Sequence, residues 1–226
     1  DADRMIKACD DNGVALAVDH TRRWNPRYHK VRDTVRSGAI GSLGTIVATL
    51  GGPRAMLFAN GTHLIDMVCF FAESQPTQVF ARLEDGYESY AAYTNISNKD
   101  PANDPALSGF ILFENGVRAM YCGEKNTFGM FSFQLSGPDG QVYVNDSTST
   151  LVVSDPDKSF GQPKRKIHPG QYQVHGIAAA YQELIDVIEN GGESVSSGRE
   201  ALKSLKIMLG FLRSQQEGAR LIDISG

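Results

Sequence analysis

The sequence lacks several features that would assign the chain to a familiar class. It has no basic run and a formal net charge of −4, which argues against a nucleic-acid partner. No apolar run approaches the ~20 residues of a membrane-spanning helix, so we expect no membrane partner. It has only three cysteines, far apart and expected as buried free thiols, with no Cys-x-x-Cys pair, so no metal site is predicted. No signal peptide precedes the first helical pattern, and together with free thiols this predicts a cytoplasmic protein.

A further absence concerns cofactors. No G-x-G-x-x-G occurs anywhere in the 226 residues. That glycine pattern lets the backbone approach the pyrophosphate of a dinucleotide. The sequence therefore predicts no cofactor-binding residues within this chain.

The N-terminal stretch predicts one helix and one strand. Residues 1–12 place Met5, Ile6 and Cys9 on one side of a helix that ends at Asn12-Gly13. The continuous apolar run Val14–Val18 is typical of a parallel strand buried on both faces. One helix and one strand cannot form a domain, so we expect residues 1–24 to be the end of a unit whose remainder is absent.

Residues 25–226 predict an α+β domain. Asn25-Pro26 begins a helix, Asn115-Gly116 and Pro138-Asp139-Gly140 each join two strands, and the box Ser197–Glu200 begins a late helix. A long polar loop over 84–105 has room for a short strand at 90–94.

The expected elements are strands at 45–50, 76–83, 109–114, 117–124, 130–136, 141–145, 150–154 and 221–224, and helices at 26–37, 62–71, 175–189 and 198–217. They predict a large open, mostly antiparallel sheet with helices on one face. Its uncovered face should carry apolar residues, which predicts a partner subunit.

The stretch Gly51–Phe71 carries the best candidate chemistry. After Thr62, its apolar helix holds only two polar side chains, His63 and Asp66, which share one face. A histidine suits proton transfer because its pKa lies near neutrality, and the helix start disfavours the imidazolium form. Asp66 either orients the His63 ring or stabilises the helix start. A metal hydrolase using these two residues is a further alternative.

Two residues before this helix are candidate substrate contacts. Asn60 either bonds the substrate or shapes the loop. Arg54 follows Gly51-Gly52-Pro53 and either pairs with a carboxylate or phosphate of the substrate or is solvated. No partner is evident for His20 or His29.

Several segments, in order, resemble the glucose-fructose oxidoreductase / inositol dehydrogenase (Gfo/Idh/MocA-type) family. They are NGVALAVDHTRRWNPRYHKVRDTVRSGAIGSLGTI, GTHLID, and SSGREALKSLKIML with GARLIDI. The resemblance implies a Rossmann domain for NAD or NADP, followed by an α+β domain with an open sheet. That second domain holds much of the substrate site and commonly dimerises through its sheet. Residues 1–24 would then be a Rossmann remnant, and residues 25–226 the substrate-binding domain of a homodimer.

The chain departs from the family pattern at two places. The Glu-Lys-Pro motif, whose lysine is catalytic, does not occur, and Asp-x-Gly-x-His is replaced by Ala59-Asn60-Gly61-Thr62-His63. The resemblance therefore transfers His63 as the catalytic residue without its usual aspartate.

The segment HTRRWNP resembles the part of the family that borders the nicotinamide and substrate. It points to Arg23 and Trp24 as substrate-site residues, with at most one of Arg22 and Arg23 facing the pocket; packing at the domain junction is the alternative role of Trp24.

Together these features predict the C-terminal domain of an NAD(P)-dependent oxidoreductase acting on a sugar, cyclitol or related polyol. Alone, the chain would be inactive, because it lacks the cofactor site and the lysine. The alternative is a non-catalytic sugar-binding or assembly module, which Ala59 favours.

Overall fold

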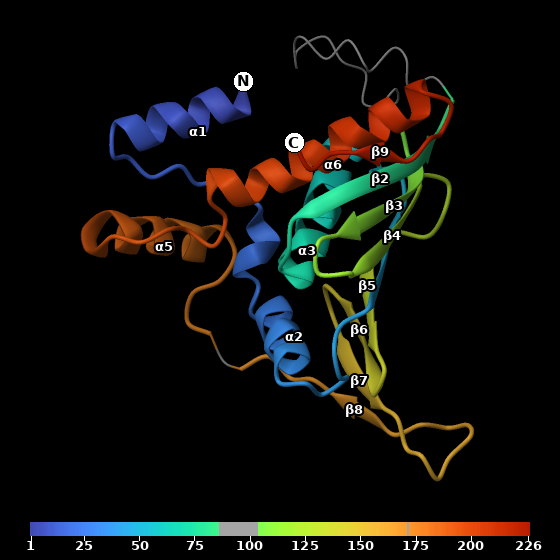
Figure 1. The fold of residues 1–226 in the computed structure, drawn as a ribbon. Coiled ribbons are helices and arrows are strands. Elements are labelled where there is room, and N and C mark those ends of the chain that lie inside the picture. The colour runs from blue at the N-terminus through green and yellow to red at the C-terminus, as the bar shows by residue number, and fades with distance from the viewer. Residues whose placement is uncertain (86–103, 171) are drawn as a thin grey trace.

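Nine strands form one open sheet in the computed structural model, which describes residues 1–85, 104–170 and 172–226 (Figure 1). The strand order is β8-β7-β6-β5-β1-β4-β3-β2-β9. Strands β1 and β4 pair in parallel, and the other neighbouring strands pair antiparallel. The predicted α+β class with a mostly antiparallel open sheet is confirmed. The short strand expected at 90–94 lies outside the described residues.

The elements follow the sequence pattern closely. The helices are α1 (Ala2–Asp11), α2 (Pro26–Arg36), α3 (Thr62–Ala72), α5 (Ile177–Asn190) and α6 (Gly198–Gln216). The strands are β1 (Thr45–Gly51), β2 (Pro76–Leu83), β3 (Leu107–Phe113), β4 (Arg118–Glu124), β5 (Met130–Gly137), β6 (Gly140–Asn145), β7 (Ser149–Val153), β8 (Lys164–Lys166) and β9 (Ile222–Asp223).

Helix α3 lies at the centre of the core. All side chains from Leu64 to Ala72 are buried, as expected for a stretch that is apolar apart from Asp66. Helices α3 and α6 lie against one face of the sheet (Figure 1). Alternate residues of the central strands are buried on this face, as in β1, where Ile46, Ala48 and Leu50 are buried.

Three local signals form the structures that the sequence predicts. The Asn25 side chain accepts a hydrogen bond from Arg27 N, with Pro26 at the first helical position. The Ser197 hydroxyl accepts one from Glu200 N at 3.3 Å, which caps α6. Gly116 has a positive φ in the turn between β3 and β4.

The strand expected over Val14–Val18 is wrong. Val14 is exposed, and the segment forms one antiparallel bridge, from Ala17 to Ser197. Val18 N donates to Ser196 O, and Gly198 N donates to Leu16 O. A buried parallel strand needs neighbouring parallel strands, and the described residues supply none beside this segment.

The cysteine prediction was correct in part. All three thiols are free, and Cys69 is buried as expected, whereas Cys9 is only half-buried. Cys122, however, is exposed, because its position in β4 points to the uncovered face of the sheet. No helix in the described ranges is long and apolar enough to cross a membrane.

Candidate active site around His63

The position of His63 is fixed by an unusual start to α3. A π-helical turn, Leu57–Gly61, leads directly into the helix. The buried carboxylate of Asp104 accepts a hydrogen bond from Phe58 N at 3.1 Å, and Leu57 N donates to Pro105 O. A β-carbon on Gly61 would lie 2.8 Å from the hydroxyl oxygen of Tyr121, so this close approach requires glycine. The turn therefore holds His63 in the first turn of α3.

The ring of His63 is half-buried and contacts a second histidine. The His20 and His63 ring centroids lie 5.7 Å apart at an interplanar angle of 69°. Within the described residues, the buried Nδ1 of His63 has no hydrogen-bond partner. Burial lowers the pKa of His63, and electrostatic interaction with His20 and Arg22 lowers it further, against the opposing effect of Asp66 and Asp19. The imidazole is thus neutral near pH 7 and has a nitrogen able to accept a proton.

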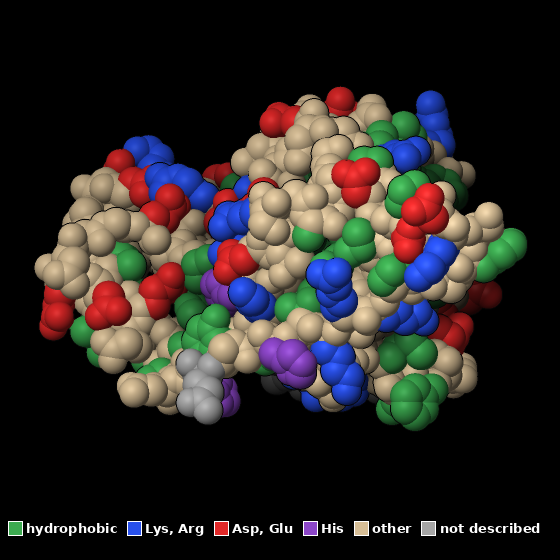
Figure 2. Space-filling view, turned by 90° about the horizontal axis from the view of Figure 1, so that it is seen from below, with side chains coloured by type: hydrophobic (Ala, Val, Ile, Leu, Met, Phe, Trp, Pro, Cys, Tyr) green, Lys and Arg blue, Asp and Glu red, His purple; other side chains and the backbone are tan. Residues whose placement is uncertain are grey.

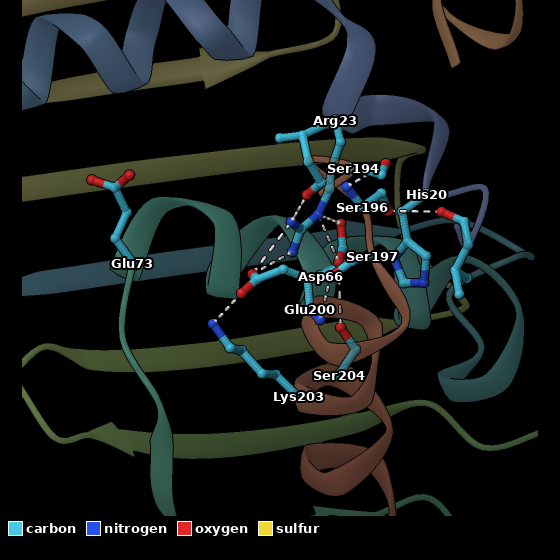
Figure 3. A network of polar contacts seen from close by, with 12 residues as sticks. His20, Arg23, Asp66, Glu73, Ser194, Ser196, Ser197, Glu200, Lys203 and Ser204 are labelled. Carbon is cyan, nitrogen blue, oxygen red and sulfur yellow. Dashed lines mark hydrogen bonds and ion pairs between the residues drawn. The ribbon is translucent and has the colours of Figure 1, made fainter. Parts of the chain in front are cut away.

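Asp66 lies on the far side of this histidine pair and is fully buried. Arg23 Nε donates to both of its oxygens, at 3.0 and 2.8 Å (Figure 3). His20 Nδ1 lies 3.0 Å from Asp66 Oδ1, an ion-pair distance at an angle outside the hydrogen-bond range. Ser204 of α6 also donates to this carboxylate, at 3.5 Å. Burial alone would raise the pKa of Asp66, but its contacts with His20 and Arg23 outweigh burial and lower it.

Arg23 joins this carboxylate to the start of α6. Its guanidinium also donates to Val195 O and, at 3.4 Å, to Glu200 Oε2. Glu200 in turn accepts a hydrogen bond from Lys203 at 2.6 Å. Burial alone would lower the pKa of Arg23, but Asp66 and Glu200 raise it. Arg23 and Asp66 therefore form a buried ion pair that ties the His20 segment to α3 and α6.

The remaining predicted site residues lie in different environments. Trp24 is buried, and its indole Nε1 donates to Glu183 Oε2 of α5 at 3.0 Å. Asn60 is half-buried in the π-helical turn, and Arg54 is exposed on the turn after β1. Of the adjacent arginines, Arg22 lines an open hollow, and Arg23 is buried.

Sequence reasoning missed His20. The only hint was its place directly before the RRW segment, because its partners Asp66 and His63 come from a helix more than forty residues later. Within the described part of the chain, no group of three or more His, Cys, Asp or Glu side chains is arranged to hold a metal ion.

Two curated proteins are similar to nearly the whole chain in sequence. D-apiose dehydrogenase of Paraburkholderia graminis is 23% identical over 96% of this chain, and inositol 2-dehydrogenase of Rhizobium meliloti is 23% identical over 96%. The chain spans 62% of the first protein and 68% of the second. No family model matches the chain.

Solved structures show the same fold. A putative NADPH-dependent oxidoreductase from Desulfitobacterium hafniense superposes with a TM-score of 0.78 at 21% identity, over 99% of this chain and 69% of that one. An oxidoreductase from Agrobacterium radiobacter, in complex with NAD+, L-tartaric acid and magnesium, superposes with a TM-score of 0.74 at 18% identity, over 99% and 69%. With the order of its motifs, these similarities make the chain a relative of the Gfo/Idh/MocA-type oxidoreductases.

Proposed function

We propose that these residues form the C-terminal, substrate-binding part of an NAD(P)-dependent oxidoreductase that acts on a hydroxyl group of a sugar, cyclitol or related polyol. The observation that carries this proposal is the half-buried His63 ring, which contacts His20 at the start of α3 and whose pKa is lowered by burial. The proposal also draws on the similarity to D-apiose and inositol dehydrogenases, whose names indicate a sugar and a cyclitol as substrates. The proposed location of the protein is the cytoplasm.

In this proposal His63 accepts or returns the proton of the reacting hydroxyl group. A neutral imidazole suits that task near pH 7, because it can accept a proton. His20 contacts one side of the His63 ring. Asp66 contacts His20, and Arg23 in turn binds Asp66. Arg23 and Asp66 act as positioning residues, because both are buried and bonded to each other.

Three other side chains complete the proposed substrate site. Asn60 precedes His63 by one helical turn and is proposed to bond a substrate hydroxyl. Arg54, exposed on the turn after β1, is proposed to reach the substrate from the outside. Trp24 is proposed to border the site, and its indole bonds Glu183 of α5.

The described residues do not fit a dinucleotide. The sequence has no G-x-G-x-x-G, and residues 1–24 form α1, an extended segment and a short 3₁₀ turn without a parallel sheet. We therefore assign NAD or NADP to a Rossmann domain of which residues 1–24 are the last part. The 226 residues alone are expected to be inactive.

An exposed apolar surface is available for that Rossmann domain. Helix α5 exposes Ile177, Tyr181, Ile185 and Ile188, which recur along one face at helical spacing. A groove of about 1030 Å³ lies between α1, the segment after it and the ends of α5 and α6. Exposed apolar surfaces of this kind mark interaction sites.

The uncovered sheet face is the proposed dimer contact. Paired positions place Phe80, Phe110, Met120 and Val47 in one row across β2, β3, β4 and β1. Met120 is 48% exposed and Phe80 38%. A second copy would bury this row through a two-fold contact.

Ala59 favours a second candidate function, a non-catalytic sugar-binding or assembly module. The family's usual aspartate would stand four residues before His63, and alanine offers no carboxylate there. Such a module would bind a polyol without needing His63 as a proton acceptor.

The isolated chain allows a direct test. We expect millimolar myo-inositol or D-apiose to shift the His63 imidazole signals in NMR spectra, and His63→Asn to leave the fold intact. In a protein that also carries a Rossmann domain, His63→Asn should lower kcat by about a hundredfold or more. Full activity of that variant would favour the non-catalytic module. Micromolar NADH binding by the isolated chain would contradict the assignment of the cofactor to a separate Rossmann domain.

A further inference from the structure

A hollow beside the proposed site is unusually rich in positive charge. It has a volume of about 440 Å³ and is lined by Thr21, Arg22, Asn25, Arg27, Asp146 and His175. Its size lies within the range of small-molecule sites. Figure 2 shows basic and histidine side chains interspersed across the middle of the face seen from below.

Arg22 has hydrogen-bonding capacity that the protein uses only in part. Its guanidinium lies over the Phe131 ring, 3.6 Å from the centroid, and its side chain is 22% exposed. One nitrogen lies 3.4 Å from Asp146 Oδ2, a long contact, and the buried Nε has no hydrogen-bond partner among the described residues. A guanidinium offers five N–H donors in a planar fork suited to carboxylate and phosphate.

The carboxylate in the hollow, that of Asp146, already accepts hydrogen bonds from the protein. Asp146 Oδ1 accepts a hydrogen bond of 2.6 Å from the Tyr28 hydroxyl. The second arginine, Arg27, makes a long contact of 3.5 Å with Ser149 Oγ. Two guanidinium groups and one carboxylate line the hollow, which leaves an excess of positive charge.

Two helix starts add to this electrostatic preference. Helix α2 begins at Pro26 and α5 at Ile177, and residues just before both, Asn25 and Gly176, line the hollow. Gly176 offers no side-chain cap to α5. The partial positive charge at helix N-termini favours an anion.

The hollow is connected to the proposed reaction site through the backbone. Thr21, in its lining, directly follows His20, whose ring contacts His63. The charge of Arg22 also acts on His63. A ligand group held by Arg22 would therefore lie near the hydroxyl that His63 serves.

We infer that this hollow, between Arg22, Arg27 and the starts of α2 and α5, binds the anionic group of a sugar acid or sugar phosphate. The inference rests on the proposed function and narrows its substrate class to polyols that carry a carboxylate or a phosphate ester. The arginines anchor the anion, and the hydroxyl that reacts lies toward His63.

Calorimetry on the 226-residue chain at low ionic strength tests this inference, with D-glucuronate, D-glucose 6-phosphate, D-glucose and inorganic phosphate as probes. We expect at least one anionic sugar to bind about tenfold more tightly than D-glucose, and more tightly than inorganic phosphate. Arg22→Gln and Arg27→Gln should each weaken that binding by about tenfold or more, the effect of losing a charge-assisted hydrogen bond. Arg22→Lys should retain part of the affinity, and the matched control Arg213→Gln on α6 should retain all of it.

Several results would overturn the inference. They are equal affinity for glucuronate and glucose, no binding of either anionic sugar at millimolar concentration, or unchanged binding in Arg22→Gln with its circular dichroism intact. Inorganic phosphate that binds as tightly as the sugar phosphate would show an anion site unrelated to the substrate. Neutral polyols that bind and shift His63 while the anionic sugars do not would overturn this inference and leave the proposed function standing.

Discussion

The rings of His20 and His63 meet edge to face, with their centroids 5.7 Å apart. One comes from the segment before α2 and the other from the first turn of α3. Behind them, Asp66 contacts His20 and binds Arg23, so one buried carboxylate fixes the histidine that in turn contacts His63. The protein therefore supports His63 through a second histidine, although the carboxylate usual in the family is replaced by Ala59.

The titration of His63 should report this arrangement. We expect an NMR titration to give His63 a pKa below the usual value of about 6.5, because burial and nearby positive charge disfavour imidazolium. Arg22→Gln should raise that pKa, and Asp19→Asn should lower it further. Arg213→Gln, a change of the same kind on α6, should leave it unchanged. A wild-type value at or above 6.5, or an identical value in Arg22→Gln, would contradict this account.

The Arg23–Asp66 pair should be far more important to stability than a surface pair. Arg23→Met or Asp66→Ala alone leaves a buried charge without its partner, and we expect each to lower the free energy of unfolding by about 3–5 kcal/mol. The double variant should cost clearly less than the sum of the two. Urea unfolding measures the free energy of unfolding of the two single variants and the double variant.

The exposed pair of Arg36 and Glu73 provides the control. Both side chains are partly solvated, so Arg36→Ala should cost about 1 kcal/mol or less. Equal losses in the free energy of unfolding on breaking the buried pair and the exposed pair would argue against a structural role for the buried pair.

Acid should weaken the fold through Asp66. Its pKa is lowered in the folded state, so its charged form contributes stability above the unfolded-state pKa of about 3.9. That contribution is lost as the pH falls through the lower, folded-state pKa. We therefore expect the stability difference between wild type and Asp66→Asn to be large at pH 7 and to shrink below about pH 4. A difference that stays constant from pH 7 to pH 2 would refute the linkage.

Local signals in the sequence were enough to predict most elements. Asn25-Pro26, Asn115-Gly116 and Ser197 each act on backbone groups within a few residues, so their effect does not depend on the distant chain. The apolar stretch from Thr62 to Phe71 likewise predicted a helix, and α3 forms over Thr62–Ala72.

Features set by distant contacts were not predictable in the same way. The apolar run Val14–Val18 fits a buried strand, but strand formation depends on neighbours. Among the described residues, it forms a single bridge with the residues at the start of α6. Likewise, β8 is three residues long, all of them charged, and exists because β7 offers it an edge. The contact of His20 with Asp66 and His63 depends on packing between segments forty-odd residues apart.

The uncovered sheet face should mediate self-association. Met120 stands between Phe110 and Val47 in the exposed apolar row, so Met120→Lys would place a charge in the middle of a proposed two-fold contact. Because each copy carries the change, the contact receives two charges, and we expect the dimer dissociation constant to rise by about tenfold or more.

Sedimentation velocity over a range of concentrations measures the association, and Met5→Lys supplies a matched control. Met5 is also an exposed methionine, at 58% against 48% for Met120, but it belongs to α1, away from the sheet (Figure 1). Its replacement should leave the dissociation constant unchanged, because α1 takes no part in the proposed contact. A wild-type chain that is monomeric at high concentration, or equal weakening by the two lysine variants, would rule out this face as the dimer contact.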